Sequence, residues 1–193
     1  LDPVHVETRA DSRVVYLQRP DFGRRLDEAS RERLKNASPT TPDILLAIVD
    51  GLSADAVHRH AVPVAAGLAK RLCERGLTVG TVPVVRYGRV ALQDELGEIV
   101  GAKVAVSLIG ERPGLGSPDS LGAYLVHGPR IGRTDADRNC VSNIWPAGLP
   151  YDAAIDTLAW LVTESINRGV SGVTLKDDRR IGASGPAAKL ENG

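Results

Sequence analysis

Residues 43–50 of the chain are DILLAIVD, in which six consecutive apolar residues, Ile44 to Val49, lie between two aspartates. A strand with one face in water alternates apolar and polar residues, whereas an unbroken apolar run of this length indicates a strand buried on both faces. Such strands are typical of parallel sheets that helices cover from both sides. The run therefore predicts an α/β fold built around residues 44–49.

Strand and helix patterns alternate on both sides of this run. Ser53 is a candidate cap for a helix that reaches Arg75 and ends at Gly76, and Pro63 inside it predicts a kink or a break. Further strands are predicted at residues 14–17, 77–85, 103–109 and 123–126, and further helices at residues 20–34, 91–100 and 151–168. The alternation predicts a mostly parallel sheet with helices on both faces.

The 193 residues suffice for one domain with a sizeable core. We predict a single domain over residues 1–178, including a short N-terminal arm. Residues 129–150 follow neither periodicity and are predicted to form a long irregular stretch. Residues 179–193 are polar and rich in Gly, Ala and Ser, and are predicted to be a mobile or artificially added tail.

Three predicted strands are followed by unusual loops, which begin at Asp50, Arg86 and Gly110. In open α/β sheets, ligands bind in the crevice beyond the carboxyl ends of the strands. We therefore expect the three loops to meet at one edge of the sheet, and this edge to carry the functional site.

The charge balance excludes several classes of partner. Lys plus Arg and Asp plus Glu number 24 each, so no net field draws the chain to nucleic acid or to a membrane surface. The apolar runs are too short to span a bilayer, and no basic start followed by an apolar region indicates a secretion signal. We therefore expect a cytoplasmic protein without nucleic-acid or membrane partners.

The cysteines and histidines give no metal site and no disulfide scaffold. The two cysteines are too few for such a scaffold; Cys73 is predicted to be a small buried hydrophobe, and Cys140 lies in a polar loop. His58 and His60 are two residues apart, so on a helix they point in different directions.

Motifs of common enzyme classes are missing as well. The sequence lacks the G-x-G-x-x-G run of dinucleotide sites, the P-loop and the G-x-S-x-G nucleophile elbow. Glu111 beside Arg112 is a candidate catalytic acid with a partner that tunes its pKa, but adjacent charges in a Gly/Pro loop are usually solvated, so a loop ion pair is the favoured interpretation. No catalytic residue is assigned.

The loops themselves resemble a known family. Runs in the same order and of unusual composition are found in the small (light) subunit of ethanolamine ammonia-lyase, from about Val14 to about Thr174. They are Arg19-Pro20-Asp21-Phe22-Gly23-Arg24-Arg25-Leu26, Asp50-Gly51-Leu52-Ser53, Arg86-Tyr87-Gly88-Arg89-Val90, Gly110-Glu111-Arg112-Pro113-Gly114-Leu115 and Asp137-Arg138-Asn139-Cys140-Val141-Ser142-Asn143-Ile144.

The resemblance implies a Rossmann-like subunit that binds the lower part of adenosylcobalamin. It also implies a partner, the TIM-barrel large subunit, which binds ethanolamine, so that the two subunits form a hetero-oligomeric ammonia-lyase. That enzyme converts ethanolamine to acetaldehyde and ammonia by a radical mechanism, and the small subunit is not expected to be active alone. Relatives often carry an N-terminal extension linked to packaging in a bacterial microcompartment; this chain starts without one, so packaging stays open.

Three positions of the family motifs are cobalamin contacts, and the resemblance transfers them to Val90, Glu111 and Cys140. A carboxylate accepts hydrogen bonds from the amide groups around the corrin, Val90 offers apolar surface, and Cys140 offers a small polarisable contact. The Asp-x-His-x-x-Gly motif, whose His replaces the cofactor's own base on cobalt, is missing. The resemblance therefore implies that the base stays on cobalt and that this chain does not ligate the metal.

Two other functions remain as alternatives. One is a self-sufficient α/β enzyme that uses Glu111 and Arg112 on a small substrate, and the other is a regulatory cobalamin-binding module. Under the favoured hypothesis, residues 129–150, with their mixture of Arg and Asp and with Trp145, are predicted to contact the large subunit or the cofactor.

Overall fold

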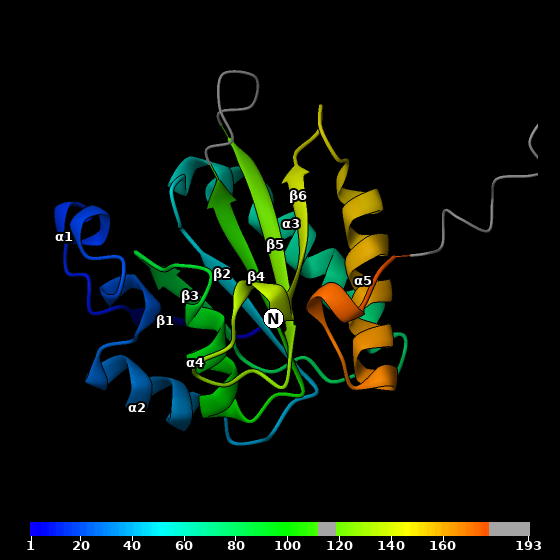
Figure 1. The fold of residues 1–193 in the computed structure, drawn as a ribbon, viewed down its shortest axis with the longest axis horizontal. Coiled ribbons are helices and arrows are strands. Elements are labelled where there is room, and N and C mark those ends of the chain that lie inside the picture. Colours follow the sequence, from blue (N-terminus) through cyan, green and yellow to red (C-terminus); the bar gives the residue numbers. More distant parts are fainter. Residues whose placement is uncertain (112–118, 178–193) are drawn as a thin grey trace, which may run out of the picture.

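A six-stranded sheet in the order β1-β3-β2-β4-β5-β6 forms the centre of the protein (Figure 1). The computed structural model describes residues 1–111 and 119–177; the predicted tail at 179–193 lies outside them. The strands are β1 (Pro3–Glu7), β2 (Ile44–Val49), β3 (Val82–Arg86), β4 (Val104–Glu111), β5 (Ser120–His127) and β6 (Arg138–Ile144). The α-helices are α1 (Arg13–Gln18), α2 (Glu28–Ala37), α3 (Ala54–Cys73), α4 (Leu92–Val100) and α5 (Tyr151–Arg168). The 3₁₀ turns are η1 (Phe22–Arg24), η2 (Asp135–Asp137) and η3 (Gly172–Thr174).

The sheet is mixed. Strands β1, β3, β2 and β4 run parallel, whereas β5 pairs antiparallel with β4, and β6 pairs antiparallel with β5. The predicted α/β class with helices on both faces is confirmed. Only β5 runs opposite to the other five strands, because β6, antiparallel to β5, returns to the direction of β4.

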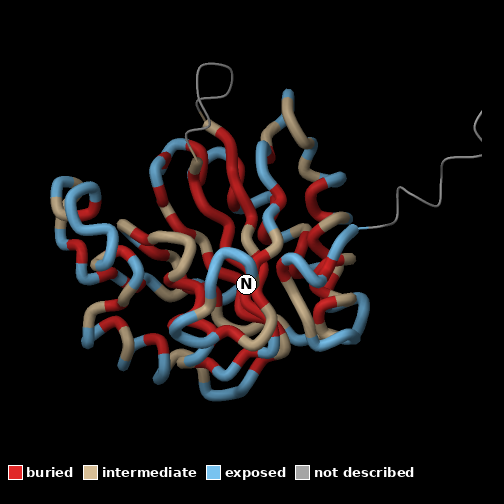
Figure 2. The backbone as a smooth tube through the Cα atoms, in the orientation of Figure 1, coloured by how far each residue is buried: buried red, intermediate tan, exposed pale blue. Residues whose placement is uncertain are grey.

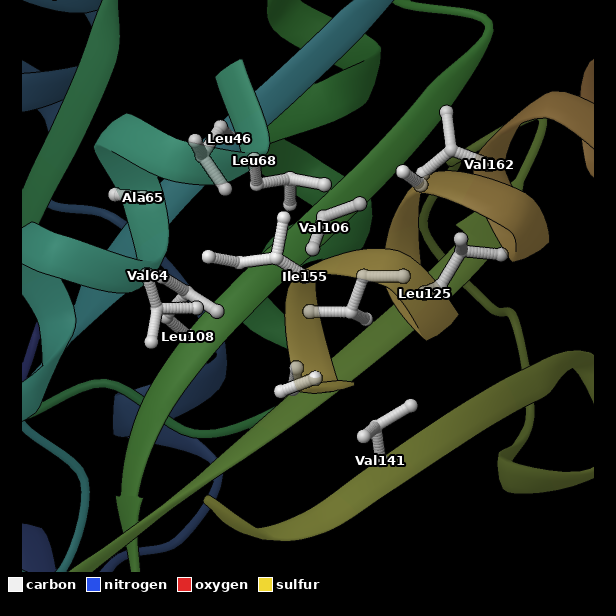
Figure 3. Close-up of a cluster of buried hydrophobic side chains, with 14 of the residues drawn as sticks. Leu46, Val64, Ala65, Leu68, Val106, Leu108, Leu125, Val141, Ile155 and Val162 are labelled. Carbon is white, nitrogen blue, oxygen red and sulfur yellow. The ribbon is translucent and has the colours of Figure 1, made fainter. Parts of the chain in front are cut away.

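Side chains of β2 divide between two apolar clusters, as its unbroken apolar run predicts. Ile44 and Leu46 pack with α3 and α5, and Leu45 and Ala47 face the opposite side with α2 and α4. Figure 3 shows the first cluster, where side chains of α3 and α5 lie over those of the central strands. Figure 2 shows that the buried backbone is concentrated along the same strands. Each fully buried Leu or Ile contributes roughly 1.5–3 kcal/mol, so these two layers supply most of the driving force for folding.

Helix α3 confirms its predicted start, and of the predicted kink or break at Pro63 the break is absent. The hydroxyl of Ser53 accepts a hydrogen bond of 3.3 Å from the backbone N–H of Ala56. The helix runs through Pro63 without a break. Val64 and Leu68, which follow the proline, are completely buried against the sheet and α5, and this packing outweighs the lost backbone hydrogen bond.

The N-terminal predictions were wrong in two places. Residues 3–7, for which no strand was predicted, form β1 and pair in parallel with β3. Residues 14–17, expected to be a strand because of their β-branched and aromatic residues, lie in α1. The hydroxyl of Ser12 caps this helix, and the buried Tyr16 anchors it. A local cap and one tertiary anchor thus override the β propensity.

The stretch 129–150 is also more regular than predicted, because it contains η2 and the whole of β6. A register shift in the pairing of β5 with β6 leaves Arg138, Val141 and Ile144 as the buried residues of that strand. A spacing of three is not the alternation that identifies a strand in sequence.

Candidate functional site

The loops that follow β2 and β3 meet the end of β4 at the carboxyl edge of the sheet. The backbone N–H of Gly88 donates to Oδ1 of Asp50 over 3.2 Å, and that of Leu52 donates to the carbonyl of Gly110 over 2.9 Å. Burial raises the pKa of Asp50, while hydrogen bonds from the backbone of Tyr87, Gly88 and Gly51 act in the opposite direction. The predicted convergence of these loops is confirmed up to Glu111; residues 112–118 lie outside the described residues.

Glu111 is the last residue of β4, not a loop residue as predicted. The hydroxyl of Tyr124, on β5, donates a hydrogen bond of 2.6 Å to Oε1 of the Glu111 carboxylate. The carboxylate also lies against Gly122, where a Cβ atom would overlap it. The side chain of Glu111 is therefore half-buried and held in one orientation by two residues of the neighbouring strand.

Tyr124 connects two of the three predicted site residues. It pairs directly with Cys140 across the β5–β6 ladder, and side chains of directly opposed residues lie on the same face of a sheet. Burial and the hydrogen bond to Glu111 raise the pKa of the Tyr124 hydroxyl, so that it stays protonated and acts as a donor. The sequence motifs did not point to Tyr124; a lone phenol in an otherwise apolar strand was the available signal.

Cys140 lies on β6 with a reduced thiol, and much of the residue is exposed. Burial of the sulfur beside Tyr124 raises the pKa of the thiol, the negative charge of Glu111 adds to this, and the hydrogen bond with Tyr124 opposes it. The thiol is therefore neutral near pH 7. Cys73 is exposed as well, rather than buried as predicted, because α3 ends there beyond the edge of its packed face.

Val90 lies in the turn that leads into α4 and is half-buried. It packs against the apolar cluster on the α2 and α4 face, which includes Ile109 and, at its margin, Tyr124. Val90, Glu111 and Cys140 are thus on the same side of the sheet. Glu111 lies at its carboxyl edge, whereas Cys140, opposite Tyr124, is level with the middle of β4. Glu111 and Cys140 share Tyr124 as a direct partner, whereas Val90 joins them through the apolar cluster.

A buried ion pair lies between α4 and the start of β6. Arg138 of β6 contacts Asp94 of α4 at 2.6 Å, and both side chains are less than 5% exposed. Burial raises the pKa of Asp94 to about 6, against the opposing effect of Arg138. The pair ties the first turn of α4 to β6, so it fixes the element that follows Val90 relative to the strand that carries Cys140.

Two of the open cavities lie on opposite faces of the sheet. One, of about 390 Å³, lies at the ends of β1, β2 and β3 on the α3 face and is lined by residues that include Ile48, Val57 and Val84. The other, of about 300 Å³, lies on the α4 face and is lined by Asp21, Arg24, Arg25, Ala91, Asp94, Ile131, Gly132 and Arg133.

The described residues hold neither a cluster of metal-ligating side chains nor a membrane-spanning helix. Residues 1–111 and 119–177 contain no group of three or more His, Cys, Asp or Glu side chains arranged to hold a metal ion. In the same part of the chain, every helix is too short or too polar to cross a membrane.

The fold and the arrangement of its loops define an α/β domain of the class whose ligands lie beyond the carboxyl ends of the strands. The family model described as ethanolamine ammonia-lyase light chain (EutC) matches residues 1–176. The chain therefore belongs to the ethanolamine ammonia-lyase light chain family.

Individual relatives agree with this assignment. The ethanolamine ammonia-lyase small subunit of Rhodopseudomonas palustris is 51% identical over 185 residues, which are 96% of this chain and 71% of the relative. That of Pseudomonas putida is 46% identical over 93% of this chain and 67% of the relative. That of Ralstonia nicotianae is 50% identical over 89% of this chain and 65% of the relative. The chain thus spans about two thirds of the length of these relatives.

Proposed function

We propose that this chain is the cofactor-holding subunit of an adenosylcobalamin-dependent ethanolamine ammonia-lyase. In this proposal it binds the lower part of the cofactor and presents it to a TIM-barrel large subunit, which binds ethanolamine. The products are acetaldehyde and ammonia. The observation that carries the proposal is the Glu111 carboxylate at the carboxyl edge of β4, oriented by Tyr124 and next to Cys140, in a chain of this family.

The chemistry of these residues fits the rim of cobalamin. The corrin ring carries amide side chains whose NH₂ groups require acceptors, and a carboxylate is a strong acceptor. Tyr124 occupies Oε1 of Glu111 and leaves Oε2 available for such an amide. Val90 supplies half-exposed apolar surface, and the neutral thiol of Cys140 supplies a small contact that carries no charge.

In the proposed complex the residues of this chain bind and orient the cofactor. When bound, adenosylcobalamin supplies an adenosyl radical through homolysis of its cobalt–carbon bond. Tyr124 keeps the Glu111 carboxylate in one position, and the Asp94–Arg138 pair holds α4 against β6. We further propose that the cofactor retains its own base on cobalt and that no side chain of this chain replaces it.

The alternative of a self-sufficient enzyme receives less support. Its candidate pair is Glu111 with Arg112, and Arg112 lies outside the described residues. Glu111 accepts a hydrogen bond from Tyr124, as expected for a positioned binding group. No observation favours a regulatory cobalamin-binding module over a subunit of the lyase.

Co-expression with the large subunit tests the proposal. We expect the two chains to purify together, the complex to show the visible absorption of bound cobalamin, and ammonia release to require both chains and the cofactor. The chain alone, with adenosylcobalamin added, should release no ammonia from ethanolamine. Turnover by the chain alone, or a complex that forms but binds no cobalamin, would contradict the proposal.

A further inference from the structure

The cavity of about 300 Å³ on the α4 face has three arginines in its wall. Arg24 and Arg25 come from η1 and the residue after it, Arg133 comes from the loop between β5 and β6, and Ala91 contributes the start of α4. Figure 1 shows this loop lying in front of the sheet beside α4. Two segments that are distant in the sequence thus bring arginines to one hollow, and a third segment, at the start of α4, completes its wall.

The acidic residues of the wall do not neutralise these arginines, because each already has a cationic partner. Asp94 pairs with Arg138 at 2.6 Å, and Asp21 pairs with Arg19 at 2.7 Å. Within the part of the chain that the structure describes, the side chains of Arg24 and Arg25 have neither a hydrogen bond nor an ion pair. Among the described residues, the positive charges of Arg24 and Arg25 therefore have no acidic partner.

Arg133 differs from the other two in being held by the backbone. Its Nε donates to the carbonyl of Gly128 over 3.1 Å, and its Nη2 donates to that of His127 over 2.9 Å. The nearest carboxylate oxygen, on Asp137, is 3.6 Å from Nη1. The charge of Arg133 is thus positioned mainly by neutral carbonyl groups, in a half-buried place where water screens it less than at an open surface.

The wall that carries Arg24 and Arg25 is fixed at both ends. Before them, the carbonyl of Gly23 accepts a hydrogen bond of 2.8 Å from the N–H of Arg89, and a Cβ atom at Gly23 would lie only 2.8 Å from Cγ of Arg89. After them, the N–H of Leu26 donates over 2.8 Å to the buried carboxylate of Glu95. The position of the two arginine backbones is therefore set before any ligand arrives.

We propose that this cavity binds a phosphate group and, building on the proposed function, that the group is the phosphodiester in the nucleotide loop of cobalamin. Guanidinium groups match phosphate oxygens in geometry and charge. Ala91, in the cavity wall, directly follows Val90, so the cavity adjoins one of the proposed cobalamin contacts. This assignment gives a role to the Arg24-Arg25 motif, which the three proposed cobalamin contacts leave unexplained.

The test uses the two-subunit complex and three ligands. Cobalamin carries the phosphodiester, cobinamide phosphate keeps a phosphate but lacks the base, and cobinamide lacks both. Binding is measured by visible absorption for the wild type, for the double variant Arg24→Gln/Arg25→Gln and for Arg133→Gln. Arg71→Gln, a half-exposed arginine of α3 near α5 that pairs with Asp156, is the matched control.

We expect the double variant and Arg133→Gln to weaken binding of cobalamin and cobinamide phosphate by about ten-fold or more, and to leave cobinamide unchanged. The control should behave as the wild type. Equal weakening for all three ligands, or none, overturns the proposal. A lower affinity for the large subunit with unchanged ligand binding also overturns it, because the arginines would then contact the partner chain.

A second measurement distinguishes the two possible ligands of the cavity, free phosphate and the phosphodiester of cobalamin. Inorganic phosphate is titrated against the wild-type complex and the same variants by calorimetry. If phosphate binding depends on the arginines while cobalamin binding does not, the cavity takes free phosphate and the cobalamin assignment is overturned. If the wild-type complex binds no cobalamin at all, the proposed function fails, and the phosphate titration still reports on the cavity.

Discussion

The hydroxyl of Tyr124 donates a 2.6 Å hydrogen bond to the carboxylate of Glu111, thirteen residues earlier in the chain and on the neighbouring strand. The same tyrosine stands opposite Cys140 on its other side. One phenol thus sets the orientation of a carboxylate and the surroundings of a thiol, although neither the family motifs nor their spacing included it. The arrangement makes Tyr124 a positioning residue for the proposed cofactor contacts.

Replacing Tyr124 by Phe should weaken cobalamin binding without abolishing it. The variant keeps the aromatic ring but removes the hydroxyl, so the Glu111 carboxylate becomes free to rotate and must be ordered when the ligand binds. A hydrogen bond to a charged group contributes roughly 1.5–3 kcal/mol, and part of that should appear as a loss of affinity of several-fold to about ten-fold. Affinity is measured by visible absorption of the two-subunit complex. An unchanged affinity would show that the orientation of Glu111 does not matter.

Replacing Glu111 by Gln should weaken cobalamin binding by about ten-fold or somewhat more, because an amide oxygen is a weaker acceptor than a carboxylate. Glu111→Ala should do at least as much harm. Thermal melting of the small subunit should change little, since Gln keeps an acceptor for Tyr124. Glu74→Gln, at the exposed end of α3, serves as the control. A large drop in melting temperature would assign Glu111 a structural role instead.

Gly122→Ala should act on the cofactor through Glu111. A Cβ atom at this position would overlap the Glu111 carboxylate and displace it from Tyr124. We expect a loss of cobalamin affinity similar to that of Glu111→Gln, and the double variant should lose little more than either single one, because both changes remove the same interaction. Additive losses of affinity would show that Gly122 and Glu111 act independently.

The unbroken apolar run of β2 was sufficient to predict the layered architecture, because burial on both faces leaves few other arrangements. The two edge strands, β1 and β6, were harder to predict, for physical reasons. β1 is a short edge strand with one fully buried residue, Val6, and the register shift of β6 removes the alternation of its side chains. Their place in the sheet depends on tertiary pairing rather than on local pattern.

The candidate site was predictable to a similar degree. The resemblance supplied Val90, Glu111 and Cys140, and the strand order brought their loops to one side of the sheet. Sequence could not supply Tyr124 or Gly122, because their roles arise from the antiparallel register of β5 against β4 and β6. Strand direction is a tertiary property, and the expected parallel sheet would have placed other residues beside Glu111.

Asp94 should make the free energy of unfolding depend on pH. Its pKa of about 6 in the folded chain lies above the ordinary value of 3.8, so the folded state holds the proton more tightly. The contribution of this carboxyl is therefore fully present below about pH 4 and is lost as the pH rises through 6, by at most roughly 3 kcal/mol.

The measurement is urea unfolding of the wild type and of Asp94→Asn between pH 4 and 7. The difference in unfolding free energy between wild type and variant reports on Asp94. His127, whose lowered pKa affects stability in the same pH range with the opposite sign, is present in both proteins and cancels. We expect this difference, wild type minus variant, to fall as the pH rises. Carboxyl carbon NMR of the wild type gives an independent midpoint, and a midpoint near 4 would contradict the prediction.

Residues 130–137 should become protected from hydrogen exchange when the two-subunit complex forms. Most of this segment is exposed, it carries the exposed apolar side chain of Ile131, and it borders the arginine-lined cavity. β6, which follows it, is already hydrogen-bonded to β5, so added protection there should be smaller.

Exchange is compared for the chain alone, with the large subunit, and with the large subunit plus cobalamin. Protection that needs only the large subunit identifies a contact between the chains, whereas protection that appears only with cobalamin identifies a cofactor contact. Residues 70–76, at the far end of α3, are the internal control and should exchange equally in all three samples. If residues 130–137 exchange as fast in the complete complex as in the isolated chain, the segment contacts neither partner nor cofactor.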